Sequence, residues 1–332
     1  MSDRDAPAVR WGVIGCGDVV KRRVAQAILN DPDSELTALC RRDASRLADF
    51  GREFGVERRH TCWRELIEQG GLDAVYIATP VSLHREQTMA AANAGLHVLV
   101  EKPMAMRAAE CAEMIAACEQ ADVRLGVAYY RRFYPVVERI RQLIESGEIG
   151  SVLHVDAITA TPFLFRGDED GAWRVDLERG GGGALMDIGS HRIDLFLHLC
   201  GEPAEIRGVC STVAADHAAE NCAVLAMTFS GGSTATARVF FGGGVDPDEF
   251  SVLGTAGRLI SAPLNDGGLA IETAAGVRRE QHPPHENFNS PLIADFVRAI
   301  RERRPPLIDG AAGAQTNSVM QACYENAGAT WV

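Results

Sequence analysis

Strand and helix signals alternate through the first 127 residues, and this alternation constrains the fold more than any other feature of the chain. The expected strands are apolar runs at residues 9–15, 36–40, 73–79, 97–100 and 124–128. The expected helices end near residue 29 and cover residues 44–54, 84–94 and 108–120. Continuous apolar strands joined through helices are typical of a parallel sheet covered on both faces. The pattern predicts an α/β domain of the doubly wound Rossmann type over residues 1–127.

After Tyr134-Pro135 strands follow strands, and long helices become rare. The expected strands are residues 152–158, 206–213, 223–229, 234–241, 250–254 and 269–273. The expected helices are residues 136–145, 184–199, 291–303 and 313–328. Successive strands without crossover helices favour antiparallel pairing. We therefore expect residues 128–332 to form an α+β domain with a large, mainly antiparallel sheet for substrate binding and oligomerisation. Whether the C-terminal helices pack back on the first domain stays open.

Composition excludes several classes of partner. The chain has 332 residues and a formal net charge of −12, with no basic patch, which argues against nucleic-acid and membrane partners. Its start is polar, and no stretch approaches the ~18 apolar residues of a membrane span, so we expect a cytoplasmic protein. Nine cysteines without a CxxC pair predict reduced thiols, and His282 and His285 lie near no cysteine, so we expect no metal site.

A glycine pair follows the first expected strand. Gly15 permits a tight turn there, and Gly17 lets the backbone approach a pyrophosphate at the start of the next helix, beside Asp18 and Val19. Val20 replaces the third glycine of the dinucleotide fingerprint. A tight turn without a ligand is the alternative. The position of this turn in a series of strands and helices favours a dinucleotide site.

The end of the second expected strand bears on the choice of cofactor. An acidic residue at this position usually binds the ribose hydroxyls of NAD, but here Arg41 stands in its place, followed by Arg42. A guanidinium can hold a 2′-phosphate and stack on adenine, so NADP is expected and NAD is the alternative. Both arginines could instead form a solvated face, with Asp43 as a helix N-cap.

Three further residues carry the expected chemistry. Lys102 follows the strand at 97–100, at the sheet edge where ligands bind. Asp187 and His191 stand four apart in one helix, on one face, and a carboxylate beside histidine suits proton transfer. The alternatives are a surface lysine and a helix-surface ion pair. The glycine run at 180–183 favours the active-site interpretation, because glycine permits close approach of another element.

Together these segments resemble the glucose–fructose oxidoreductase/inositol dehydrogenase/rhizopine catabolism (Gfo/Idh/MocA) family. The matching motifs cover nearly the whole chain in order: GCGDVV, ATPVSLH at 78–84, EKP at 101–103, YYRRFYP at 129–135, AWR at 172–174, GGGALMDIGSHRIDL at 181–195 and PLIADFVRAI. The resemblance is highly specific for the family and much less so for the substrate.

The resemblance implies roles for individual residues. Lys102 matches the catalytic lysine, Asp187 the substrate-binding acid and His191 the proton-transfer histidine. Further cofactor contacts are implied for Thr79, Pro80, His84 and Glu101. Further substrate contacts are expected at Tyr130, Arg131, Trp173 and Arg174. For Trp173 and Arg174, a core aromatic beside a surface arginine is the alternative.

The resemblance implies an oxidoreductase that moves a hydride to or from a carbinol carbon of a sugar or polyol, of aldose or inositol type, and Arg41 favours NADP as its cofactor. Two alternatives stay open: a reductase of a dihydrodiol or other non-sugar carbonyl or imine, and an inactive regulator that senses a sugar or dinucleotide. The strands at 223–229 and 234–241 carry apolar residues at many positions, which suggests that both sheet faces are buried. We therefore expect a homodimer or homotetramer that packs through this sheet.

Overall fold

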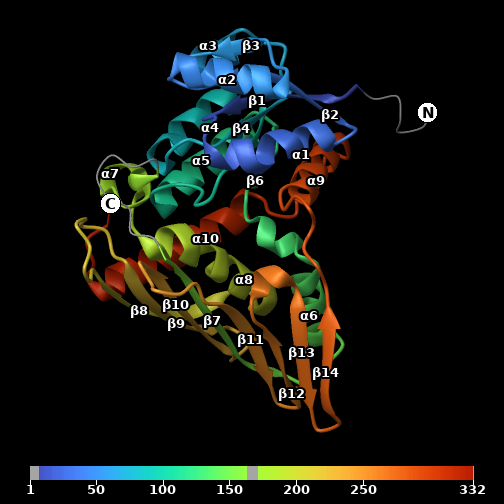
Figure 1. The fold of residues 1–332 in the computed structure, drawn as a ribbon, viewed down its shortest axis with the longest axis vertical. Helices are drawn as coiled ribbons and strands as arrows, with labels where there is room; N and C mark the ends of the chain where they lie inside the picture. The colour runs from blue at the N-terminus through green and yellow to red at the C-terminus, as the bar shows by residue number, and fades with distance from the viewer. Residues whose placement is uncertain (1–6, 163–170, 332) are drawn as a thin grey trace. The chain divides into compact units, whose positions relative to one another are not determined.

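The computed structural model describes residues 7–162 and 171–331. The chain divides into two compact units (Figure 1). The first comprises Met1–Tyr130 with Asn287–Ala314, and the second comprises Arg131–Glu286 with Gln315–Val332. No helix in the described part of the chain combines the length and the apolar composition needed to cross a membrane. All nine cysteines lie in the described part of the chain and carry free thiols.

The first unit contains a six-stranded parallel sheet with the strand order β3-β2-β1-β4-β5-β6. Its strands are β1 (Val9–Ile14), β2 (Ser34–Cys40), β3 (Arg58–His60), β4 (Ala74–Ile77), β5 (His97–Val100) and β6 (Leu125–Val127). This confirms the predicted doubly wound sheet, whose order reverses between β1 and β4. We did not predict β3, because Arg-Arg-His is too short and too charged to give an apolar run.

Helices complete the first unit: α1 (Ala25–Asn30), α2 (Ala44–Phe54), α3 (Trp63–Glu68), α4 (His84–Asn93), α5 (Ala108–Gln120) and α9 (Ser290–Arg301). A π-helical stretch, Val20–Val24, precedes α1. Asp43 caps α2 by accepting a hydrogen bond from the Arg46 amide at 3.0 Å, as predicted. Helix α9 packs on the sheet through Phe296, whose ring lies 5.6 Å from that of Trp11. A Cβ on Gly126 would lie 2.9 Å from Phe296, so glycine leaves room for this contact.

The second unit contains an eight-stranded sheet with the order β14-β13-β12-β11-β7-β10-β9-β8. Its strands are β7 (Val152–Thr161), β8 (Pro203–Ser211), β9 (Cys222–Phe229), β10 (Thr234–Phe241), β11 (Asp248–Gly254), β12 (Gly257–Ser261), β13 (Gly268–Thr273) and β14 (Gly276–Gln281). Only β7 and β10 pair in parallel, which confirms a mainly antiparallel sheet. We did not predict β12 and β14. Strand β14 is largely charged and therefore lacks the alternating apolar pattern.

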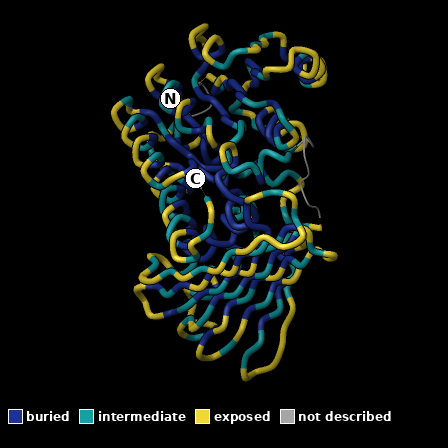
Figure 2. The backbone as a smooth tube through the Cα atoms, turned by 90° about the vertical axis from the view of Figure 1, so that its left-hand side faces the viewer, coloured by how far each residue is buried: buried dark blue, intermediate teal, exposed yellow. Residues whose placement is uncertain are grey.

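The helices of this unit are α6 (Pro135–Glu145), α7 (Leu177–Gly180), α8 (Ser190–Cys200) and most of α10 (Gly310–Ala327). Alternate residues of β9 show that one sheet face is covered: Leu225 is fully buried, whereas Val224 is 42% exposed. Figure 2 shows this mixture along the strands, with buried, intermediate and exposed positions side by side. The opposite face of the sheet, which we call the outer face, therefore carries exposed apolar side chains within a single chain.

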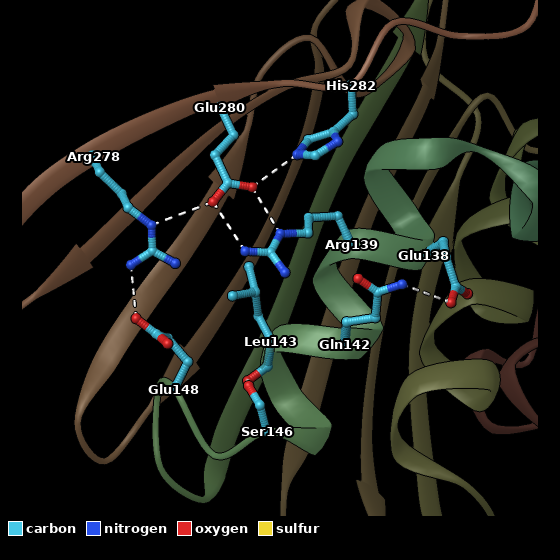
Figure 3. A network of polar contacts seen from close by, with 9 residues as sticks. All are labelled: Glu138, Arg139, Gln142, Leu143, Ser146, Glu148, Arg278, Glu280 and His282. Atoms are coloured by element: carbon cyan, nitrogen blue, oxygen red, sulfur yellow. Dashed lines mark hydrogen bonds and ion pairs between the residues drawn. The ribbon is translucent and has the colours of Figure 1, made fainter.

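An ion pair connects the edge strand β14 to helix α6 (Figure 3). The Glu280 carboxylate accepts hydrogen bonds from Arg139 at 2.7 and 3.1 Å, and the His282 ring lies 2.8 Å from it. Arg278 donates to Glu148 at 2.7 Å. The hydrogen bonds from Arg139 lower the pKa of Glu280 to about 2. Charged side chains on an edge strand also oppose pairing with another sheet.

Candidate active site

Three loops meet at one edge of the parallel sheet, where the sequence predicts the cofactor site. In the registers of β1, β4 and β5, Ile14 pairs with Ile77, which pairs with Val100. Backbone hydrogen bonds continue beyond the strand ends, from Ala78 to Ile14 at 2.7 Å and from Glu101 to Ile77 at 2.8 Å. The loops after these three strands therefore lie side by side, at the point where the strand order reverses. Ligands of doubly wound sheets bind at such switch points.

The glycine loop after β1 combines one crowded and one open glycine. Gly15 has φ +96°, and a Cβ there would lie 2.6 Å from the carbonyl group of Ala78. Among the described residues, a Cβ on Gly17 would meet only the Gly15 oxygen, at 3.9 Å. Gly15 is thus needed for the turn, whereas Gly17 presents bare backbone on an open side. Bare backbone before a helix fits the pyrophosphate of a dinucleotide.

Arg41 lies against this glycine loop. Its Nη1 donates a hydrogen bond to the carbonyl oxygen of Cys16, and its guanidinium carbon lies 6.0 Å from the ring centroid of Phe50. Arg42 is exposed. Arg41 therefore brings a fixed positive charge to the loop, where it suits a phosphate group.

The loop after β5 holds Lys102 next to an engaged carboxylate. Oε1 of Glu101 accepts a hydrogen bond from the Tyr76 hydroxyl at 2.7 Å, and Oε2 accepts one from the Lys102 amide at 3.2 Å. The Lys102–Pro103 bond, whose isomer the sequence leaves open, is cis. Glu101 thus anchors the turn to β4, while the partly exposed Lys102 side chain extends from the strand end.

His84 ties two of these loops together. The side chain is 1% exposed, and Nε2 lies 2.9 Å from the Thr79 carbonyl oxygen. Nδ1 lies 3.1 Å from the Pro103 and 3.3 Å from the Met104 carbonyl oxygen. Burial lowers the pKa of His84, which favours the neutral ring. The histidine therefore fixes the turn at Thr79 relative to the loop that carries Lys102.

The chain passes from the first unit to the second between Tyr130 and Arg131. Tyr130 belongs to the first unit, where its ring stacks on Phe288 at 6.1 Å and the Arg23 guanidinium lies 4.9 Å from its centroid. Only 7% of Tyr130 is exposed. Arg131 begins the second unit.

In the second unit, Asp187 and His191 share one continuous helical segment. Asp187 lies in a π-helical stretch, Leu185–Gly189, and His191 lies in the first turn of α8. Such stretches are frequent at functional sites. Arg174 places its Nε 3.5 Å from Oδ2 of Asp187, and its guanidinium lies 4.8 Å from the Trp173 ring. The fold therefore brings Trp173, Arg174 and Asp187 together.

Two ion pairs that we did not predict connect helix α8 to other segments of the second unit. Asp194 accepts hydrogen bonds from Arg132 at 2.7, 3.0 and 3.1 Å. Arg192 forms an ion pair with Asp248, which also accepts from the Asn265 amide at 2.9 Å. The local signal is the presence of two charged residues, Arg192 and Asp194, in a helix whose other residues are apolar apart from one serine and two histidines. Among the described residues, no cluster of His, Cys, Asp and Glu side chains is arranged to hold a metal ion.

Comparisons with known proteins cover both units. Residues 9–129 match a family described as an oxidoreductase family with an NAD-binding Rossmann fold, and residues 137–260 match the GFO/IDH/MocA C-terminal domain. The chain is 31% identical over 321 residues to 1,5-anhydro-D-fructose reductase of Ensifer adhaerens, covering 92% of each chain. It is 29% identical over 328 residues to D-xylose 1-dehydrogenase (NADP(+)) 2 of Haloferax volcanii, covering 96% of this chain and 97% of that one.

A solved structure supports the same relationship. The aldose-aldose oxidoreductase of Caulobacter crescentus, complexed with glycerol, superposes with a TM-score of 0.87 at 27% identity. The superposition covers 96% of this chain and 97% of that one.

Proposed function

Since the chain belongs to the Gfo/Idh/MocA family of NAD-binding oxidoreductases, we propose that it moves a hydride between NADP and a carbinol or carbonyl carbon of a sugar or polyol. The observation that carries this proposal is Lys102, which directly follows β5 at the sheet edge shared with the glycine loop. A lysine at the carboxyl end of a parallel strand supplies a positive charge where ligands bind.

The proposed chemistry assigns separate roles to Lys102, Asp187 and His191. When bound, the nicotinamide supplies or accepts the hydride. In the direction of oxidation, His191 takes the hydroxyl proton on a ring nitrogen. Lys102 stabilises the alkoxide that develops on the substrate oxygen, and its charge opposes early protonation of His191. Asp187, held by Arg174, accepts a hydrogen bond from a neighbouring substrate hydroxyl. In the direction of reduction, protonated His191 returns the proton.

The preference for NADP rests on Arg41. Its guanidinium lies against the loop that would hold the pyrophosphate, and no carboxylate stands at this position to bind the ribose. One of the relatives is named as an NADP(+) enzyme. The adjoining loops contribute to cofactor binding through their shape rather than through charge. The residues concerned are Thr79, Pro80, His84 and Glu101.

The proposed substrate is an aldose or a cyclic polyol. Two relatives are named for an anhydro-ketose and for an aldopentose, and the solved structure binds glycerol. A panel of aldoses, inositols, linear polyols and dihydrodiols, offered with NADP and with NAD, tests this through the absorbance of the reduced nicotinamide. Saturable turnover of one group with NADP supports the proposal. Cofactor binding without turnover would identify a sensor, and turnover of dihydrodiols alone would identify the other class of enzyme.

We also propose that the protein is a homodimer or homotetramer in which the outer face of the second-unit sheet packs against another copy. Val209, Val224 and Leu253 lie on this face with 67%, 42% and 45% of their surfaces exposed. Val209 and Val224 are direct cross-strand partners, so their side chains adjoin on this face, and Arg238 is the partner of Val224 on the next strand. An apolar surface on one sheet can pair with its own copy about a twofold axis.

A further inference from the structure

A buried carboxylate accepts hydrogen bonds from the start of the helical segment that carries Asp187 and His191. Glu220 lies just before β9 and is 3% exposed. Its Oε2 accepts a hydrogen bond from the Gly183 amide at 2.8 Å, and its Oε1 accepts one from the Leu185 amide at 2.8 Å. Its backbone carbonyl accepts the amide between them, that of Ala184, at 3.1 Å. Three consecutive N–H groups are therefore satisfied by one residue.

The glycine run before this segment is explained by the same contact. A Cβ on Gly183 would lie 1.7 Å from the Glu220 carbonyl oxygen, and a Cβ on Gly182 would lie 2.3 Å from the Tyr324 hydroxyl. Neither position has room for a side chain. The prediction that these glycines permit close approach of another element is confirmed, and Glu220 and Tyr324 supply the atoms that approach.

Tyr324 holds the carboxylate from helix α10. Its hydroxyl donates to Oε1 of Glu220 at 3.0 Å, and its ring stacks on Trp331 at 5.5 Å. The carboxylate thus accepts three hydrogen bonds, two from the helical segment and one from α10. Its orientation is determined by groups that lie far apart in the sequence.

We propose that Glu220 is a positioning residue of the reaction, which fixes the backbone at Gly183–Leu185 and thereby the place of Asp187 and His191. The first N–H groups of a helix have no partners within the helix, and the acceptor oxygens of Glu220 supply partners for them here. The Asp187 amide donates to the Gly183 carbonyl at 3.0 Å, so a shift of Gly183 passes directly to Asp187. The consequence for catalysis rests on the function proposed above.

The chemistry of this contact distinguishes a carboxylate from an amide. In Glu220→Gln one oxygen remains, which can still accept from Leu185 and Tyr324. The new NH₂ group then faces the Gly183 N–H, so a donor meets a donor. The side chain keeps its size, so the substitution mainly removes the hydrogen bond from Gly183, at the start of the segment.

Two measurements on the full-length protein test the proposal. Amide hydrogen exchange of a peptide that spans residues 182–191 is expected to be at least about tenfold faster in Glu220→Gln, with first-unit peptides unchanged. The kcat for the best sugar is expected to fall about 10- to 100-fold, since small misplacements of catalytic groups have effects of this size. The Kd for NADP is expected to stay within about twofold, because Glu220 belongs to the second unit.

Two further variants serve as controls. Glu205→Gln removes an exposed carboxylate of β8, which pairs with Arg207, and should change neither measurement. Tyr324→Phe removes one of the three hydrogen bonds and leaves both backbone contacts, so a smaller fall in kcat is expected. If Glu220→Gln does not fold, Tyr324→Phe carries the same test.

The outcomes separate this proposal from the proposed function. Wild-type kcat in a folded Glu220→Gln with a lowered melting temperature would show a purely structural role and overturn the proposal. Unchanged exchange of residues 182–191 would overturn it as well. If the wild-type protein turns over no sugar, the proposed function fails, and hydrogen exchange still decides whether Glu220 holds the segment.

Discussion

Nε of Arg174 lies 3.5 Å from Oδ2 of Asp187, so a cation from a separate segment steadies the carboxylate proposed to bind the substrate. The Arg174 side chain is 30% and the Asp187 side chain 19% exposed, which leaves both accessible to a small polar ligand. We expect Arg174→Ala to raise the KM for the sugar about tenfold, because the Asp187 carboxylate loses the ion pair that holds it. Steady-state kinetics with saturating cofactor measure the change. Arg179→Ala, which removes an exposed arginine nearby, is the matched control, and an equal effect there would contradict the prediction.

Arg41 is expected to decide the choice of cofactor. Charge-assisted pairing of a guanidinium with the 2′-phosphate contributes roughly 1.5–3 kcal/mol. Arg41→Asp should therefore weaken NADP binding at least about tenfold relative to NAD, as measured by the Michaelis constants for both cofactors. Arg42→Asp introduces the same charge at the exposed neighbour and should alter the ratio much less. A ratio of the two constants that stays the same in Arg41→Asp would refute this role.

His191 is expected to be the proton acceptor. His191→Ala should lower turnover about 10²–10⁴-fold, the usual scale for loss of a general base. The pH profile of sugar oxidation should also lose its acidic limb near neutrality, and the Kd for NADP should barely change. His198→Ala, in the same helix, is the control. Near-wild-type turnover in His191→Ala would rule out the proposed mechanism.

Lys102 is expected to act through its charge. Lys102→Met keeps most of the side-chain volume and should lower turnover strongly, because the developing alkoxide loses its positive partner. The acidic limb of the pH profile should move to higher pH, since the charge that opposes protonation of the histidine is gone. Lys21→Met, which removes an exposed lysine of the same unit, should be neutral. Equal turnover in the two variants would contradict the assignment.

Glu220 should make stability depend on pH. Burial raises the pKa of Glu220 from 4.5 to about 7. A raised pKa means that the folded state favours the protonated form. The stabilisation that comes from protonation of Glu220 in the folded state is therefore complete below pH 4.5. It is lost as the pH rises through about 7. We expect wild type to lose up to about 3 kcal/mol relative to Glu220→Gln between pH 4.5 and 8. Urea unfolding at several pH values measures this, and a constant difference would contradict it.

The proposed oligomer can be tested on the outer face of the sheet. Light scattering at micromolar concentration should give two or four times the chain mass of 35.8 kDa. Val224→Glu places a charge beside Val209 on this face and should shift the mass toward the monomer. Val277→Glu, at an exposed position of edge strand β14, should not. A wild-type monomer would refute the proposal.

Patterns within short stretches of sequence were sufficient for most of the fold. Apolar runs and turn residues located β1, β2, β4, β5 and β6, because a buried strand needs only its own side chains to show its character. They failed for β3 and β14, whose residues are charged and whose pairing depends on a neighbouring strand. The glycine loop and Lys102 were found in the same way, since a strand end and its loop are adjacent in the chain.

What only the tertiary structure decided is the set of polar partners around the second-unit helix. Glu220 binds Gly183 across 37 residues and Tyr324 across 104, and Arg132 binds Asp194 across 62. No local periodicity marks such pairs, because a buried carboxylate is stable only where folding brings donors to it. The sequence by itself indicated the residues to which we assign the proposed chemistry. The folded chain determined which groups contact Asp187 and the start of its helical segment, because those contacts exist only once distant segments have packed.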